Sequence, residues 1–118
     1  MNTNELRERL DALFPQLVDE LSQLVAIPSV SSDPSHAADV DRSAEHIRSR
    51  FEALGLDAQI HSVTTPEGVQ GKPAILARSP HIEGAPTVLL YAHHDVQPTG
   101  DLARWHSDPW TTVVKGDR

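Results

Sequence analysis

One short stretch of the sequence, residues 87–98, constrains the fold more than any other. It begins with the apolar run TVLLYA and continues directly into two histidines and an aspartate. The run is rich in β-branched and aromatic residues and lies between Pro86 and Pro98, which predicts a buried strand. Polar, metal-capable side chains at the carboxyl end of a buried strand are where open α/β sheets bind their ligands.

The residues that follow this run, His93, His94 and Asp95, are the first candidates for chemistry. Side chains alternate along a strand, so His93 and Asp95 are expected on one side and His94 on the other. This pairing predicts that His93 binds a metal through one ring nitrogen while Asp95 holds the other. One alternative makes His94 the ligand, with His93 buried, and another is a strand-end histidine bonded to Asp95 with no metal. A catalytic zinc needs about three protein ligands, so further ligands must come from elsewhere.

The loop after the predicted strand holds the nearest further donors. Asp101, His106 and Asp108 lie there and are close enough in sequence to approach His93, although an exposed polar loop is the simpler interpretation of all three. No ligand spacing relates the four remaining histidines, which are expected at the surface: His36, His46, His61 and His81.

The composition narrows the choice of metal and of partner. The 118 residues include no cysteine, so a metal must be held by His, Asp or Glu, which suits zinc, manganese or cobalt. A net charge of −7 without a basic cluster argues against nucleic acid and against an anionic membrane surface. The N-terminus does not resemble a signal peptide and no apolar run approaches the length of a membrane span, so a cytoplasmic protein is expected.

An amphipathic helix is predicted at the start of the chain. Apolar residues recur at steps of three and four over residues 6–25, with Asn2 and Glu5 placed to form a capping box. Pro15 lies inside this pattern and either kinks the helix or begins a second one.

A second helix and several strands complete the predicted fold. The helix is expected to begin at Asp33, with Pro34 in its first turn, and to end at Gly55. Strands are expected at residues 56–63, 74–78, 87–92 and 111–115, followed by a turn at residues 116–118. Two helices ahead of several strands predict an α/β fold in which the helices pack on a mixed sheet. In the long connection at residues 93–109 and just beyond it, two tryptophans either line a pocket or form the core of the loop: Trp105 and Trp110.

Several motifs, in order along the chain, resemble one family of metallopeptidases. The segment LVAIPSVS at residues 24–31 resembles the family's opening, and LLYAHHDVQP at residues 89–98 resembles its first metal-site motif, H-x-D-V-x-P. Gln97 favours the dipeptidase branch. Trp105 and the DPW of residues 108–110 resemble a W-x-x-x-P-F motif, with Trp in place of the usual Phe. The family includes carnosinase-type dipeptidases, aminoacylases, acetylornithine deacetylases and succinyl-diaminopimelate desuccinylases.

The resemblance implies a function and a site. It implies that the complete enzyme hydrolyses the amide bond of a dipeptide or an N-acyl amino acid, using two zinc ions or, in their place, manganese or cobalt. His93 would bind one zinc, and Asp95 would be the catalytic carboxylate that orients the imidazole. The family's general-base Glu and its remaining ligands come later in the sequence.

The resemblance also bears on domain organisation. Residues 1–118 are expected to form the N-terminal segment of a zinc-exopeptidase catalytic domain, without the family's lid or dimerisation domain, and to be inactive alone. Homodimerisation is a further expectation for the full-length protein. The alternative is a truncated α/β scaffold domain with no catalytic role.

Overall fold

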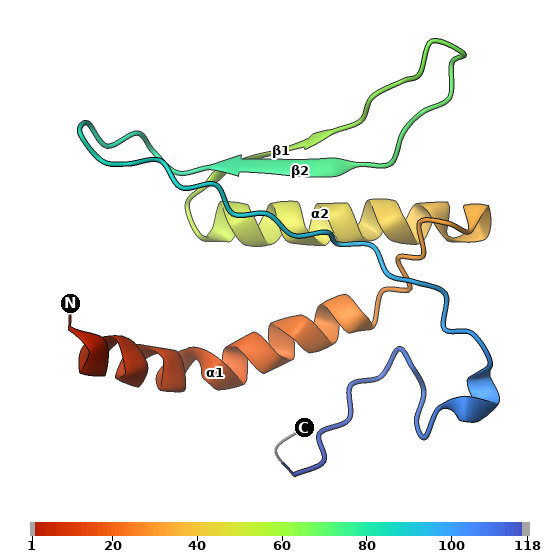
Figure 1. Ribbon diagram of the computed structural model, residues 1–118, viewed down its shortest axis with the longest axis horizontal. Coiled ribbons are helices and arrows are strands. Elements are labelled where there is room, and N and C mark those ends of the chain that lie inside the picture. The colour runs from red at the N-terminus through yellow and green to blue at the C-terminus, as the bar shows by residue number, and fades with distance from the viewer. Residues whose placement is uncertain (1, 117–118) are drawn as a thin grey trace. The chain divides into compact units, whose positions relative to one another are not determined.

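The computed structural model describes residues 2–116, which divide into two compact units. One unit is Pro28–Pro98, and the other combines residues 2–27 with residues 99–116. Figure 1 shows the order of the elements along the chain. Among the described residues, no helix has both the length and the apolar composition needed to cross a membrane.

Helix α1, Thr3–Val25, begins at the predicted capping box. The side chain of Asn2 accepts hydrogen bonds from the backbone amides of Asn4 and Glu5, each at 3.0 Å, and the Glu5 carboxylate accepts one from the Asn2 amide at 3.1 Å. The helix continues through Pro15, so this proline does not begin a second helix. The apolar stripe of α1 is present, but the structure buries none of its residues.

Helix α2, Ala37–Ala53, follows a short 3-10 turn, η1, at Pro34–His36. Asp33 caps this turn, because its carboxylate accepts a hydrogen bond from the Ser35 amide at 2.8 Å. The predicted start of the second helix at Asp33 is therefore wrong, since the α-helix begins only at Ala37, after the turn. At the other end Gly55 takes a φ of +80°, the left-handed conformation typical of the residue that follows a helix, which confirms the predicted end.

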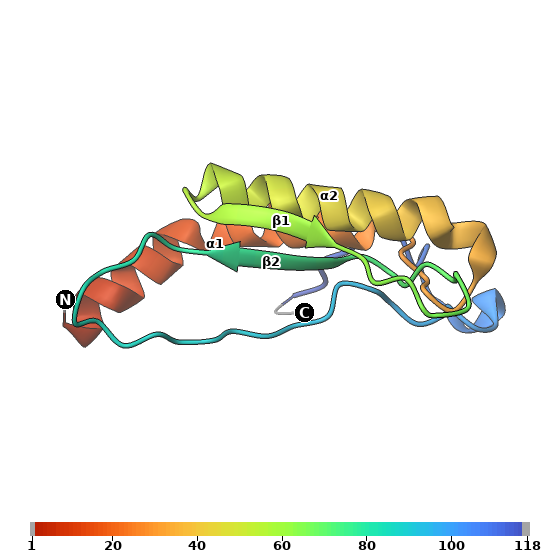
Figure 2. The same cartoon turned by 90° about the horizontal axis from the view of Figure 1, so that it is seen from above.

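A two-stranded sheet follows α2. Strand β1, Asp57–His61, and strand β2, Ala74–Arg78, are antiparallel, with Asp57 opposite Arg78 and His61 opposite Ala74. Helix α2 lies along this hairpin and contacts both strands (Figure 2). Four small or branched apolar residues form the buried core of the unit: Val30, Val40, Ala44 and Ala58. The α/β class is therefore confirmed, with helix packed on sheet.

The predicted strands at residues 87–92 and 111–115 are wrong for the described part of the chain. Neither stretch forms a ladder there, and Leu90 and Tyr91 are 88% and 90% exposed. A strand needs hydrogen-bond partners on a neighbouring strand, and within residues 2–116 neither stretch has one. The sheet that forms is accordingly antiparallel rather than mixed. The turn predicted at residues 116–118 falls largely outside the described residues.

Candidate functional site

The candidate site lies where two segments far apart in the sequence meet. Val30 and Val96 form an isolated parallel bridge, and the Val96 amide donates a hydrogen bond to the Ser29 carbonyl at 3.0 Å. Val30 is only 3% exposed, which anchors the first segment in the core. The residues just before the bridge on the second segment are His93, His94 and Asp95, so this bridge fixes the backbone of the predicted site.

His93 and Asp95 lie together on the exposed side of this segment. His93 Nδ1 is 2.9 Å from the Asp95 carbonyl oxygen and 3.1 Å from Asp95 Oδ1. Both oxygens accept hydrogen bonds, so Nδ1 must carry the proton, and in the neutral ring the lone pair is on Nε2. The His93 side chain is 76% exposed, and Nε2 has no hydrogen-bond partner among residues 2–116. His93 therefore offers one nitrogen for coordination.

Asp95 is held from its other side by Ser31. The Ser31 hydroxyl donates a hydrogen bond of 2.5 Å to Asp95 Oδ2. This bond lowers the pKa of Asp95 below its ordinary value, and the hydrogen bond from His93 lowers it further, against the opposite effect of partial burial. Asp95 is therefore an ionised acceptor at neutral pH, as its contact with the His93 N–H requires.

His94 is turned away from Asp95 and has a structural role. Its Nε2 lies 3.1 Å from the Pro73 carbonyl oxygen, an acceptor only, so Nε2 carries the proton. In the neutral ring Nδ1 then accepts from the Ser43 hydroxyl at 3.2 Å. Both ring nitrogens are thus engaged. The alternative interpretation placed His93 in the buried position, whereas the structure has His93 exposed and His94 half-buried.

The other predicted donors have local roles. Asp101 caps the short 3-10 helix η2, Leu102–Arg104, by accepting from the Ala103 amide, and Asp108 accepts from the Trp110 amide. His106 is exposed. Within residues 2–116 no group of three or more His, Asp and Glu side chains is placed to hold a metal ion. His93 and Asp95 are thus the part of the predicted site that the described chain brings together.

Trp105 and Trp110 line a hollow, which is one of the two interpretations that the sequence leaves open for them. The tryptophan loop forms an open hollow of about 440 Å³ lined by Trp105 and Trp110, and the Trp105 indole donates to the Thr99 carbonyl at 2.9 Å.

Two of the four histidines expected at the surface, His36 and His46, are half-buried, whereas His61 and His81 are exposed. His36 Nδ1 lies 2.7 Å from Asp39 Oδ2. The Nε2 of His46 is shielded from solvent without a hydrogen-bond partner among the described residues, because His46 lies on α2 beside its buried residues.

Three serines build the site although no catalytic motif of the sequence contains them: Ser29, Ser31 and Ser43. Ser29 and Ser43 are each 1% exposed, and the Ser29 hydroxyl donates to the His94 carbonyl at 3.0 Å. Ser29 and Ser31 stand two positions apart directly after Pro28, a spacing that places two side chains on one side of an extended segment. That spacing was the available signal, whereas nothing in the local sequence marks Ser43.

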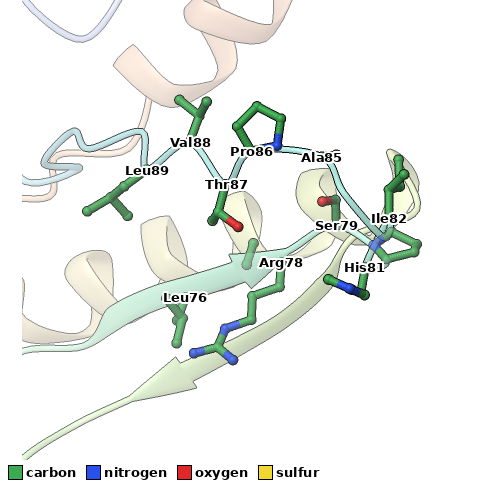
Figure 3. Close-up of a pocket in the computed structure, with 12 residues that line it drawn as sticks. Leu76, Arg78, Ser79, His81, Ile82, Ala85, Pro86, Thr87, Val88 and Leu89 are labelled. Atoms are coloured by element: carbon green, nitrogen blue, oxygen red, sulfur yellow. The ribbon is translucent and has the colours of Figure 1, made fainter.

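A further hollow of the Pro28–Pro98 unit is separate from this site. It has a volume of about 560 Å³ and lies between β2 and the extended segment at residues 85–89. Figure 3 shows Leu76 and Arg78 on one side of it and Thr87 and Leu89 on the other. Neither His93 nor Asp95 lines it, so it adds no donor to the candidate metal site.

Comparisons with known proteins agree with the resemblance seen in the sequence. No family model matches the chain. The chain is 34% identical over 113 residues to the Cys-Gly metallodipeptidase DUG1 of Candida albicans, covering 90% of the chain and 23% of that protein. It is also 34% identical over 94 residues to the cysteinylglycine-S-conjugate dipeptidase of Corynebacterium striatum, covering 80% of the chain and 20% of the relative.

A solved structure gives the same result for the fold. The structure superposes on the dipeptidase Dug1p from Saccharomyces cerevisiae with a TM-score of 0.83 and 30% sequence identity, covering 92% of the chain and 24% of Dug1p. The chain thus spans about a quarter or less of the length of these relatives. By sequence and by structure, the chain belongs to the metallopeptidase family of the Cys-Gly dipeptidases and matches the N-terminal part of its members.

Proposed function

We propose that the full-length protein is a metal-dependent hydrolase that cleaves the peptide bond of a dipeptide, with N-acyl amino acids as the wider substrate class. The relatives reported above are named as dipeptidases. The observation that carries the proposal is the His93 ring, whose Nδ1–H is held by Asp95 and whose Nε2 is exposed. A carboxylate on the far nitrogen of an exposed imidazole is the usual surrounding of a histidine that binds a metal.

The residues present fit a metal as one part of its ligand set. A neutral imidazole suits zinc, and also manganese or cobalt, and no cysteine competes with it in this chain. Because residues 2–116 contain no group of three donors, we propose that the other ligands, and those for a second metal, belong to the rest of the full-length protein. We propose a second metal because the sequence motifs resemble those of a two-metal family.

The chain's own residues have defined parts in this chemistry. When bound, the metal supplies Lewis-acid chemistry that polarises a carbonyl and lowers the pKa of water. His93 binds it through Nε2. Asp95 keeps the proton of His93 on Nδ1, which fixes the tautomer and directs the ring. Ionised Asp95 also makes the imidazole a stronger donor to the metal. We therefore assign Asp95 to orienting the ligand rather than to proton transfer with the substrate.

Metal titration of the full-length protein tests the ligand assignment. Zinc binding is measured calorimetrically for the wild type, for His93→Ala and for His81→Ala, an exposed histidine in the loop after β2. His93→Ala is expected to weaken zinc binding by more than about 100-fold, more than the loss of an outer partner typically costs. His81→Ala is expected to leave it unchanged. Equal affinity in the wild type and His93→Ala would remove His93 from the ligand set.

Substrate assays test the reaction class. With zinc, manganese or cobalt bound, the full-length protein is expected to hydrolyse Cys-Gly or another dipeptide, with N-acetyl amino acids as the comparison set. Hydrolysis of neither class under any of the three metals would refute the proposal. A polypeptide of residues 1–118 alone is expected to show no turnover, since it contains one of the required ligands.

Two further properties belong to the same proposal. We expect the full-length protein to be cytoplasmic and to form a homodimer. Light scattering coupled to size exclusion measures the mass in solution, and a monomer at micromolar concentration would contradict the dimer.

A further inference from the structure

We propose that Ser31 is a positioning residue for metal binding by His93, acting through the carboxylate of Asp95. The inference rests on the proposed role of His93 as a ligand and extends the site by one residue. Ser31 does not touch the metal or the substrate in this scheme. Its hydroxyl fixes the orientation of the group that in turn fixes the imidazole.

The geometry assigns one partner to each oxygen of Asp95. Ser31 Oγ donates to Oδ2 at 2.5 Å, and His93 Nδ1 donates to Oδ1 at 3.1 Å. A carboxylate with only one anchored oxygen can rotate about its last side-chain bond, because that torsion is broad. With both oxygens bonded, the plane of the carboxylate is fixed, and so is the direction of the His93 ring that donates to it.

The backbone holds both ends of this arrangement. Ser31 directly follows Val30 and Asp95 directly precedes Val96, the two residues joined by the parallel bridge. Val30 is 3% exposed and cannot shift without opening the core. The Ser31 hydroxyl is therefore presented to Asp95 by a rigid pair of segments and not by a loose loop.

Loss of the Ser31 hydroxyl would leave Asp95 Oδ2 without this donor and free the carboxylate to rotate. The Asp95 carbonyl, 2.9 Å from His93 Nδ1, would remain as an acceptor. Removal of the hydroxyl is therefore expected to loosen the orientation of the His93 ring without releasing it from Asp95.

The experiment compares Ser31→Ala with Ser31→Thr in the full-length protein. Threonine keeps the hydroxyl and alanine removes it, so a role of the hydroxyl separates the two variants. Ser32→Ala is the matched control, because Ser32 is the exposed neighbour. Zinc affinity is expected to fall about tenfold in Ser31→Ala, the lower end of the range for partners that lie outside the ligands themselves. Ser31→Thr and Ser32→Ala are expected to stay within about twofold of the wild type, well below that range.

A second readout does not depend on the metal. Nitrogen-15 NMR of the His93 ring in metal-free protein reports which nitrogen carries the proton. The wild type and Ser31→Thr are expected to show the Nδ1–H tautomer. Ser31→Ala is expected to show a smaller share of it, but not to lose it, because the Asp95 carbonyl still accepts from Nδ1. If Ser31→Ala does not fold, Ser31→Cys replaces it in the NMR measurement. Cysteine is close to serine in size, but its thiol is only a weak hydrogen-bond donor.

The outcomes separate this inference from the proposed function. An unchanged zinc affinity and tautomer in Ser31→Ala would overturn the inference, and so would an equal loss in Ser31→Ala and Ser31→Thr. If His93→Ala weakens zinc binding while Ser31→Ala does not, the proposed function stands and the role of Ser31 fails. If His93→Ala has no effect, both fail.

Discussion

The Nδ1 atom of His94 lies 3.2 Å from the hydroxyl of Ser43, a residue 51 positions earlier that is 1% exposed on the inner face of α2. The same ring reaches the Pro73 carbonyl with its other nitrogen, at the entry to β2. The His94 imidazole thus links helix α2, the β1–β2 hairpin and the segment that carries His93 through its hydrogen bonds. The two neighbouring histidines therefore differ: the His93 ring is exposed, whereas the half-buried His94 ring is hydrogen-bonded at both nitrogens and holds the fold.

Replacing Ser43 by alanine tests the contribution of the Ser43–His94 hydrogen bond to stability. The substitution leaves the half-buried His94 Nδ1 without its donor, and an unsatisfied buried polar group costs about 1–3 kcal/mol. We expect the free energy of unfolding, measured by urea denaturation, to fall by that amount. Ser49→Ala is the control on the same helix, because Ser49 is exposed, and its effect is expected within about 0.5 kcal/mol of zero. Equal stability of the two variants would contradict the role of the Ser43–His94 bond.

Gly55 provides a test of the helix end. Its φ of +80° lies in the left-handed region, where a Cβ costs about 1–2 kcal/mol. No atom lies within 4 Å of an added Cβ, so the cost comes from the backbone and not from crowding. Gly55→Ala is expected to lower the midpoint of thermal unfolding, and Gly55→Asn to lower it less, because asparagine tolerates this conformation. If both variants lower the midpoint equally, the conformational explanation fails.

The capping box of α1 predicts a local effect. Asn2→Ala removes the acceptor for the Asn4 and Glu5 amides and is expected to cost about 1 kcal/mol of helix stability. Because α1 buries none of its residues, the change is expected as fraying of its first turn, measured by faster hydrogen exchange at the Glu5 amide. Asn4→Ala, which leaves the cap acceptor in place, is expected to leave that exchange rate unchanged.

The cap of η1 predicts a dependence on pH. The side-chain hydrogen bond from Ser35 is the largest cause of the lowered pKa of Asp33, followed by the bond from the Ser35 amide. A carboxylate with a lowered folded-state pKa adds stability above its unfolded-state pKa, and this contribution is lost as the pH falls through the folded-state value. Ser35→Ala is expected to raise the pKa of Asp33 toward its ordinary value, as followed by NMR titration of the carboxyl carbon. A pKa that does not move would assign the shift to the backbone amide alone.

The parts of the fold that were predicted well from the sequence depend on interactions between residues close together in the chain. The capping box at Asn2, the left-handed Gly55 and the strand at residues 74–78 all depend on neighbours within a few positions. The stretch at residues 87–92 was mispredicted because burial of a strand depends on distant partners, and residues 2–116 supply none. An apolar run indicates that a segment tends to be buried, but it does not identify the residues against which the segment packs.

The candidate site shows the same contrast between local contacts, which could be predicted, and long-range contacts, which could not. The two-residue spacing of His93 and Asp95 was sufficient to predict their contact, since alternation along an extended segment is a local property. The parts of Ser31 and Ser43 were not predictable in this way. Each reaches its partner across more than fifty residues, so only the folded chain shows which serines matter.

The bridge between Val30 and Val96 has a consequence for the order of folding. The hydrogen bond beside it, from Ser29 to the His94 carbonyl, joins positions 65 apart, and closing so long a loop carries an entropic cost that neighbouring contacts do not. We expect contacts of this kind to form late, after helix α2 and the hairpin. With His93 as the proposed zinc ligand, zinc affinity is then expected to depend on the stability of the β1–β2 hairpin. Substitutions in the turn at residues 62–73 are expected to weaken binding in proportion to the fraction of molecules in which that hairpin is open.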